Sequence, residues 1–347
     1  MPWHSIDVVD NAFDKTKKAL IEPFSFWKWI KLGIIIFLMG GIGGFNFNPS
    51  GFNNRNYGNE GIMPSAGDIS AQISQFLQQY LMVILIIAGL VLLLILIFSY
   101  ISNIMEFVFV HSLVTNKVRF WEYSRKYLRL GFNLFIIRIL LMLAFFVLLG
   151  ISMLPLLLPI LDSPENIGIG FIFSIIIWVI FIFLVLAIIF GIIGSFINLS
   201  IPLAMYHNLG IIAAFKKITA RFRADWKQIL VYWVVRSVLG IAVTIIIGIV
   251  ALIFFIIVFG ISALVGVLLY FVLGAIGLGW SDPLFWVVFI PYFLIAYIVL
   301  MLSTLFIIVP GPVFLKYHML TFLQVWYTEA TIPFFNAQNS IPGELIN

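Results

Sequence analysis

The chain has 347 residues, of which 63% are hydrophobic and 10% charged, with a formal net charge of +5 and a mean hydropathy of +1.17. Soluble domains carry roughly 25% charged residues, so this composition excludes an ordinary soluble protein and indicates that lipid is the main solvent. The sequence contains no cysteine, which excludes disulfides, thiolate zinc sites and cysteine nucleophiles.

The N-terminal segment, residues 1–31, is amphipathic and is predicted to contain an interfacial helix that starts after Ser5 and ends at Glu22 and Pro23. Ser5 is a candidate N-cap, and Ile6, Val9 and Phe13 then share one face. Acidic residues precede any long apolar run and no small-residue cleavage site follows a short apolar core, so the segment does not resemble a signal peptide. The first span is therefore expected to stay in the mature protein.

Six apolar segments are predicted to cross the membrane as helices, because a spanning helix needs about 20 mainly apolar residues. They are residues 29–46, 76–103, 133–161, 168–200, 228–260 and 284–309. Residues 47–68 are rich in Asn, Gly and Pro and are expected to form a loop. Pro155 and Pro159 are expected to bend the outer end of the third span.

Residues 260–280 are apolar and leave the number of spans open. A separate crossing there makes seven spans and places the tail outside. A re-entrant or interfacial piece, or an extension of the fifth helix, keeps six, which the repeat described below favours.

Basic residues are distributed very unevenly along the chain. Of 19 Lys and Arg, five lie before residue 32, six in residues 117–138, six in residues 216–236 and one at Lys316, which leaves Arg55 for all other loops. Positive residues favour the cytoplasmic side. The pattern predicts a multi-pass protein of the cell membrane with both termini in the cytoplasm.

An internal repeat explains this distribution. Arg138 matches Arg236 in the pattern, and His111, His207 and His318 close successive units. The units, residues 6–111, 112–207 and 208–318, each predict an interfacial amphipathic helix followed by a transmembrane hairpin, in parallel orientation.

The predicted fold is therefore an all-α, polytopic transmembrane helical bundle that forms one integral membrane domain over residues 1–347. Small residues are expected to let its spans pack closely: Gly40, Gly44, Gly191 and Gly194. The C-terminal segment, residues 313–347, is expected to begin a fourth interfacial helix, whose apolar face carries Leu315, Met319, Phe322 and Trp326.

The third basic segment carries the most specific chemical signal. Four of its basic residues lie opposite an apolar helical face: Lys216, Lys217, Arg221 and Arg223. Each such cation beside a span attracts anionic cytoplasmic lipids by about 1 kcal/mol. Topology alone also accounts for a solvated basic face, and recognition of a membrane or cytoplasmic protein is a further alternative. Nucleic acid is not expected.

Ionisable residues near span ends give the remaining site candidates. Arg138 and Arg236 either snorkel to phosphate head groups or line a cytoplasmic-side pocket for an anionic lipid or solute. Glu106 is expected to pair with a local arginine.

The three repeat-related histidines could together bind a metal ion only if the three repeat units are arranged around a pseudo-threefold axis. These histidines are His111, His207 and His318. Hydrogen bonds from these histidines to backbone or lipid are the commoner role. No cofactor or metal is therefore expected.

Signatures of known enzyme classes are missing from the sequence, including a phosphate-binding glycine loop, a helical His-Glu metal motif and a serine elbow. The leading hypothesis is a non-enzymatic membrane protein that organises lipids or docks a partner at the cytoplasmic face. The alternative is a permease-like carrier for a lipidic or small apolar solute. The sequence leaves the oligomeric state open.

The opening of the chain carries a distinctive set of residues: Met1, Pro2, Trp3, Asp7, Asp10, Ala12, Phe13, Thr16, Leu20, Pro23, Trp27, Leu32, Phe37, Gly40 and Gly41. This set resembles an uncharacterised family of archaeal multi-pass membrane proteins. Residues 201–217 are similar in layout to the membrane domain of bacterial glycerophosphodiester phosphodiesterases, whose catalytic domain has no counterpart here. The resemblance implies an integral membrane protein and no catalytic residues.

Overall fold

The computed structural model describes residues 3–40, 66–162 and 168–328, and each regular element in these ranges is a helix. The helices are α1 (His4–Asp7), α2 (Val9–Leu20), α3 (Phe26–Leu38), α4 (Ala66–Thr115), α5 (Phe120–Asp162), α6 (Ile169–Tyr206), α7 (Ile211–Ala224), α8 (Trp226–Ala275), α9 (Pro283–Ile308) and α10 (Pro310–Trp326).

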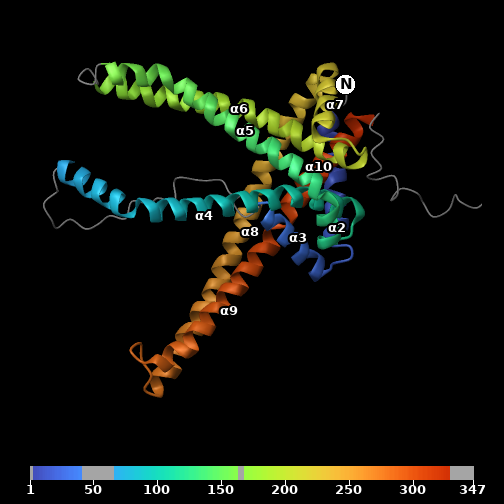
Figure 1. The fold of residues 1–347 in the computed structure, drawn as a ribbon. Helices are drawn as coiled ribbons and strands as arrows, with labels where there is room; N and C mark the ends of the chain where they lie inside the picture. The colour runs from blue at the N-terminus through green and yellow to red at the C-terminus, as the bar shows by residue number, and fades with distance from the viewer. Residues whose placement is uncertain (1–2, 41–65, 163–167, 329–347) are drawn as a thin grey trace, which may run out of the picture.

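Three arms leave a common hub in different directions (Figure 1). One arm is α4, the second is the α5–α6 hairpin and the third is the α8–α9 hairpin. Five helical stretches of the described chain are long and apolar enough to cross a membrane: Gln79–Thr115, Phe120–Leu156, Phe173–Tyr206, Trp226–Ala275 and Pro283–Trp326. The arms diverge, so they do not pack as the single bundle that the sequence analysis expected.

The hub consists of α1, α2, α7 and α10 together with the inner ends of α4, α5, α6 and α8. It contains most of the buried apolar side chains, including Phe107, Leu199, Ile229 and Phe322. Helix α10 packs against both α2 and α8, while α1 packs against α8 and α10. The N-terminal helices and the C-terminal helix therefore close the hub together.

The described part of the C-terminal segment, α10, is buried on more faces than the sequence pattern indicated, and its interfacial position stays a prediction. Met319, Phe322 and Trp326 are buried as expected, but Lys316 and His318 on other faces of α10 are buried too. Helix α10 is enclosed because α1, α2, α4, α6 and α8 all contact it. Residues 329–347 lie outside the described residues.

Several other expectations concern helix ends. Residues 261–275 continue α8, so they extend the fifth helix and do not form a separate one. Helix α3 ends at Leu38. Residues 41–65, which include the end of the first predicted span and most of the predicted loop, lie outside the described residues. Helix α5 continues through Pro155 and Pro159 to Asp162.

Two of the four glycines predicted to allow close helix packing, Gly191 and Gly194, do not support it, and Gly44 lies outside the described residues. A Cβ atom added at Gly191 or Gly194 would have no heavy atom within 4 Å beyond its own helix. At Gly131 an added Cβ would lie 2.5 Å from Cγ1 of Ile104 in α4, and at Gly311 it would clash with Ile247 in α8. Gly131 and Gly311, both at the hub, are therefore two positions where small residues bring helices very close together.

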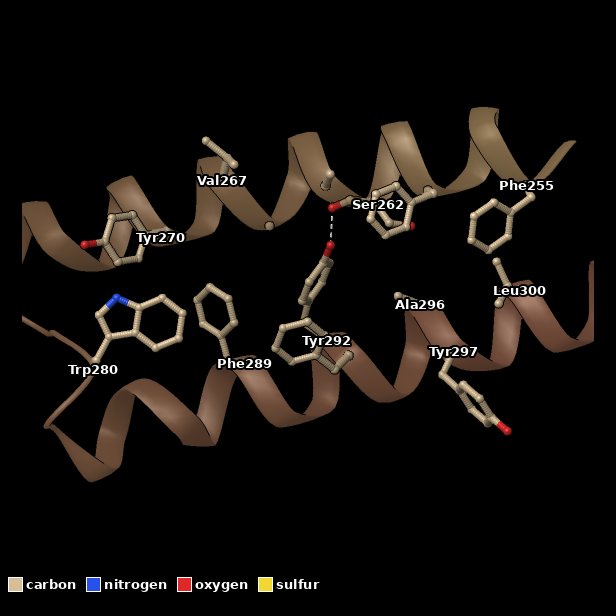
Figure 2. Close-up of a pocket in the computed structure, with 14 residues that line it drawn as sticks. Phe255, Ser262, Val267, Tyr270, Trp280, Phe289, Tyr292, Ala296, Tyr297 and Leu300 are labelled. Atoms are coloured by element: carbon tan, nitrogen blue, oxygen red, sulfur yellow. Dashed lines mark hydrogen bonds between the residues drawn. The ribbon is translucent and has the colours of Figure 1, made fainter. Parts of the chain in front are cut away.

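The arms leave most of their apolar side chains exposed, because few described residues cover them beyond the partner helix of each hairpin. Between α8 and α9 lies a groove of about 740 Å³ (Figure 2). Its walls carry aromatic rings from both helices, among them Phe255, Phe289 and Tyr292.

Candidate functional site

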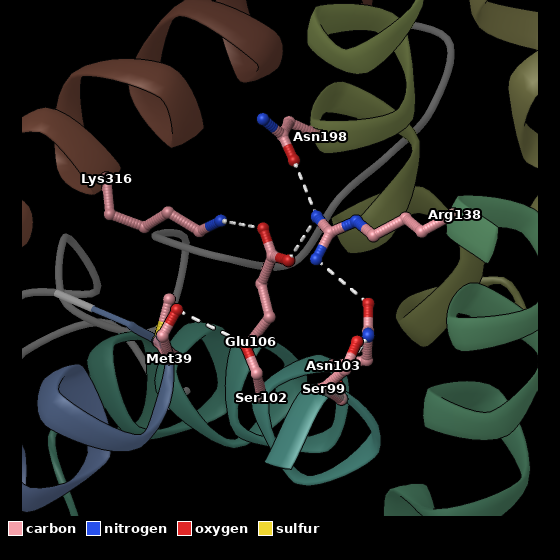
Figure 3. Close-up of polar contacts among 8 residues, drawn as sticks. All are labelled: Met39, Ser99, Ser102, Asn103, Glu106, Arg138, Asn198 and Lys316. Carbon is pink, nitrogen blue, oxygen red and sulfur yellow. Dashed lines mark hydrogen bonds and ion pairs between the residues drawn. The ribbon is translucent and has the colours of Figure 1, made fainter. Parts of the chain in front are cut away.

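The polar centre of the hub is a group of five side chains that we call the hub cluster: Asn103, Glu106, Arg138, Asn198 and Lys316 (Figure 3). Arg138 Nη2 lies 2.6 Å from Glu106 Oε2, and Lys316 Nζ lies 3.4 Å from Glu106 Oε1. Arg138 also donates to Asn103 Oδ1 at 2.9 Å and to Asn198 Oδ1 at 3.3 Å.

Four helices position these side chains. Asn103 and Glu106 stand three residues apart on α4 and so share one face of that helix. Asn103 Nδ2 donates to the Ser99 carbonyl at 2.7 Å, which turns its amide oxygen toward Arg138 of α5. Asn198 comes from α6 and Lys316 from α10.

Burial makes this arrangement electrostatically demanding. The side chains of Glu106, Lys316 and Arg138 are 10%, 8% and 36% exposed. Removing charges from water costs several kcal/mol for each ion, and close opposite charges with further hydrogen bonds offset that cost. Glu106 is therefore the counter-ion of two cations that come from different helices.

A crevice beside the cluster opens onto a third cation. This Arg236 crevice, about 560 Å³ between α6 and α8, is lined by Ile188, Gly191, Ile192, Gly194, Ser195, Asn198, Tyr232, Trp233, Arg236 and Ser237. Arg236 Nη1 donates to the Leu315 carbonyl at 2.8 Å, and the guanidinium lies 6.0 Å from the Tyr232 ring centroid. Trp233 donates to Ser195 Oγ at 2.8 Å on the opposite wall.

The Arg236 crevice explains why Gly191 and Gly194 have open space around them. They face the crevice without supporting a helix contact. Within the described part of the chain, no carboxylate lies within 4.0 Å of Arg236. The hub cluster and Arg236 together hold three cations and one carboxylate among the residues that the structure describes. Counted by formal charges, these groups therefore have a surplus of two positive units.

The two predicted arginines thus have different surroundings. Arg138 points to Glu106, Asn103 and Asn198, whereas Arg236 faces the crevice. Their roles as lipid contacts stay predictions.

The three histidines lie apart from the hub cluster. His111 Nδ1 lies 3.0 Å from the Tyr127 hydroxyl and 3.4 Å from the Tyr206 hydroxyl. His318 Nε2 lies 3.0 Å from the Ser5 carbonyl oxygen, and its ring stacks on Tyr232. His207 follows the end of α6. In the ranges that the structure describes, no three His, Asp or Glu side chains gather as a metal site would require.

Helix α7 carries the four basic residues singled out in the sequence. Lys216, Lys217 and Arg223 are exposed, while Ile211 and Ile218 are buried against the hub. Arg221 is less exposed and its Nη2 donates to the Trp326 carbonyl at 3.3 Å. The structure thus separates Arg221, which contacts α10, from three solvent-facing cations.

Further cations gather where α2 and α3 approach the end of α4. Lys28 Nζ donates to the Ala19 carbonyl and, at 2.6 Å, to Asn116 Oδ1. Burial lowers the pKa of Lys28. Burial and, to a smaller extent, the charge of Lys18 lower the pKa of Lys15 to about 8. Positive charge is therefore concentrated on this side of the hub as well.

Sequence reasoning did not single out Asn103, Asn198 or Lys316 as site residues. Asn103 and Asn198 are amides near the inner ends of apolar spans, where a polar group needs a partner. Lys316 is a lone cation in the last apolar helix. Their polarity was a usable signal, but their convergence depends on contacts between helices far apart in sequence.

The fold defines an all-helical protein with several helices that could span a membrane, joined at a charged hub. The chain belongs to a family of unknown function, DUF7544, whose sequence profile matches residues 3–332. No curated protein sequence and no solved structure shows significant similarity to the chain. The description of the family gives no biochemical role. The archaeal source and the layout of phosphodiesterase membrane domains stay predictions.

Proposed function

We propose that this protein is a non-enzymatic integral membrane protein that organises anionic lipids at the cytoplasmic face, with a lipid phosphate bound in the Arg236 crevice. In this proposal six spans form three hairpins, and both termini are cytoplasmic. The hub lies at the cytoplasmic surface and the arms enter the bilayer.

The surplus of positive charge at the hub carries this proposal. Glu106 neutralises one of the three cations formed by Arg138, Arg236 and Lys316. An uncompensated charge in a poorly solvated site is costly, so an external anion is stabilised there. A lipid phosphate fits because guanidinium groups bind phosphate oxygens with directional, charge-assisted hydrogen bonds.

The shape of the Arg236 crevice agrees with such a ligand. Gly191 and Gly194 leave one wall open, while Ser195 and Ser237 add hydroxyl groups beside Arg236. The apolar side chains Ile188 and Ile192 continue the wall away from the cation. A head group near Arg236 with chains along the isoleucines would match this gradient of polarity.

The packing of the hub supports the threefold repeat. The inner end of α4 packs against the start of α5, α6 packs against α7, and α10 packs against α2. In the first two pairs a returning span contacts a basic helical segment, and in the third α10, which directly follows the returning span α9, contacts α2 and so connects the end of the chain to its beginning. A closed ring of three equivalent contacts accounts for this arrangement.

The exposed cations of α7 have a supporting role in the proposal. Lys216, Lys217 and Arg223 attract the anionic surface over several ångströms, and salt screens that attraction. The outer arms have little contact with one another, so the bilayer sets their tilt.

Native mass spectrometry of protein taken from phosphatidylglycerol–phosphatidylcholine vesicles tests the proposal. We expect the wild-type protein to retain phosphatidylglycerol at high salt. Arg236→Gln should weaken retention about 10-fold or more, because a hydrogen bond to a charged group contributes about 1.5–3 kcal/mol. Gly194→Phe should have a similar effect by filling the Arg236 crevice, where a Cβ has open space.

Two matched variants serve as controls. Lys217→Gln removes an exposed cation and should weaken retention at low salt only. Gly240→Phe adds the same ring at an open position of α8 that does not line the crevice, and it should leave retention unchanged. Equal phosphatidylglycerol retention by wild type, Arg236→Gln and Gly194→Phe would refute the proposal. A wild-type protein that retains no lipid but moves an apolar solute across liposomes would favour the carrier alternative.

A further inference from the structure

The groove between α8 and α9 lies in the outer part of the third arm, away from the hub cluster (Figure 2). We infer that it binds one hydrocarbon chain of a bilayer lipid from the leaflet farther from the hub. This site needs neither Arg236 nor an anionic head group, so it goes beyond the proposed function.

The walls of the groove define the chemical class of its occupant. No charged side chain lines it, and aromatic rings dominate: Phe255, Phe259, Trp280, Phe289, Tyr292 and Phe293. The hydroxyl of Tyr292 already donates to the Ser262 carbonyl across the groove. A charged head group would find no counter-ion there, whereas a hydrocarbon chain gains dispersion contacts with the rings.

Small residues opposite large rings keep the groove open. Gly266 and Ala263 lie on the α8 wall, and Ala296 lies on the α9 wall. The Tyr292 ring rests against Gly266, where an added Cβ would approach its hydroxyl oxygen to 3.1 Å. Because this ring spans the two helices, it holds their backbones apart while the small residues on either side fill little space.

The groove is large enough for one hydrocarbon chain. Its volume of about 740 Å³ is in the range of sites that hold sizeable apolar ligands, roughly 300–1,000 Å³. Its α8 wall runs from Phe255 to Tyr270, which at 1.5 Å per residue is about 22 Å. Half of a hydrocarbon core of about 30 Å is about 15 Å, so the groove is longer than one leaflet is deep, and a hydrocarbon chain of one leaflet can follow most of its length.

An aromatic cluster lies at the outer end of the groove. The Trp280 ring lies 5.7 Å from the Tyr270 ring and 5.0 Å from the Phe285 ring, measured between centroids. Trp280 lies between α8 and α9 at the tip of the hairpin, the position where tryptophan marks a membrane interface. A chain that enters from this interface would thus run inward between the two helices.

Photo-crosslinking in neutral vesicles tests the inference. The probe is phosphatidylcholine with a diazirine in one acyl chain, diluted into unlabelled phosphatidylcholine, and peptide mass spectrometry locates the adducts. We expect adducts to concentrate on residues 255–270 and 289–300 relative to the equally exposed α5–α6 arm. Ala296→Phe fills the groove and should lower these adducts about fivefold, the change that ~1 kcal/mol of lost packing gives.

The control places the same ring one residue away. Ile295 is 61% exposed and does not line the groove, so Ile295→Phe should leave the adducts unchanged. Ala263→Phe fills the groove from α8, and it should act like Ala296→Phe even if one of the two perturbs folding. Adducts spread evenly over both arms, or undiminished in both filled variants, would overturn the inference. Because the vesicles contain no anionic lipid, this outcome is independent of the Arg236 crevice.

Discussion

Helix α8 passes through two environments that make different demands on its side chains. At the hub it buries Gln228, Ile229 and Tyr232 against protein and presents Arg236 to a polar crevice. In the arm it exposes most apolar side chains and forms one wall of an apolar groove around Gly266. The comparison shows that similar apolar sequence is buried in one part of α8 and exposed in the other, because only the hub surrounds the helix with other protein segments.

The two regions should therefore differ in their sensitivity to substitution. At the hub, side chains are paired with one another through ion pairs, hydrogen bonds and apolar contacts. Removal of one partner therefore leaves a buried charge or a cavity. With the arms in a bilayer, as proposed, lipid tails would replace a removed methyl group at little cost, because they are as apolar as the side chain.

Loss of the central counter-ion should give the largest effect. Glu106→Gln leaves Arg138 and Lys316 without their carboxylate, and we expect unfolding to become easier by about 3–5 kcal/mol. Thermal unfolding in detergent, followed by circular dichroism, measures the change. Ile253→Ala on the exposed surface of α8 is the arm control and should have a small effect.

A second substitution separates charge from packing in this prediction. Lys316→Met added to Glu106→Gln removes one of the unpaired cations and should recover part of the lost stability. If Glu106→Gln were as stable as the wild-type protein, the ion pairs would not hold the hub together, and the contrast between hub and arm would rest on apolar packing alone.

Two glycines allow the same comparison without charges. Gly131→Leu forces a side chain into Ile104, and overpacking of this kind costs about 1–3 kcal/mol. Gly248→Leu in α8 enters open space and should leave stability unchanged or slightly raised, because leucine favours helix more than glycine does. The measurement is again thermal unfolding. Equal losses at both positions would contradict the view that only the hub is tightly packed.

Much of the helical layout could be predicted from the sequence, because long apolar runs in lipid must be helical. The 211–224 helix and the long apolar helices were predicted near their observed positions. Pattern alone did not reveal how far α10 is enclosed, because it indicated one apolar face, whereas the polar residues Lys316 and His318 are also buried by partners on α4 and α1. Such partners lie too far away in sequence for any local pattern to reveal.

The site was predictable in its parts but not in its assembly. Glu106 was expected to find an arginine, and it lies beside Arg138, but the second cation lies 210 residues away in sequence. Gly191 and Gly194 show the opposite problem. Small residues indicate that a helix can approach closely, yet whether one does depends on the directions that the arms take from the hub.

The smallest expected effect is the contribution of Lys15, at the edge of the hub, to the pH dependence of the free energy of unfolding. Its pKa is lowered to about 8 in the folded protein from an ordinary value of 10.5, chiefly by burial. Below pH 8 both states hold the proton, and the cost of burying the charged amine is fully present. Between pH 8 and 10.5 the unfolded chain binds more protons, so the free energy of unfolding should rise with pH.

The slope of that rise should stay well below the limit of about 1.4 kcal/mol per pH unit for one proton, because water screens this half-buried amine. Unfolding in detergent from pH 7.5 to 9.5 measures the slope. Lys15→Gln should flatten it in part, since Lys28, whose pKa burial also lowers, still contributes. Lys217→Gln, an exposed control on α7, should retain the full slope. A slope unchanged in Lys15→Gln would mean that this edge of the hub is as well solvated as the outer face of α7.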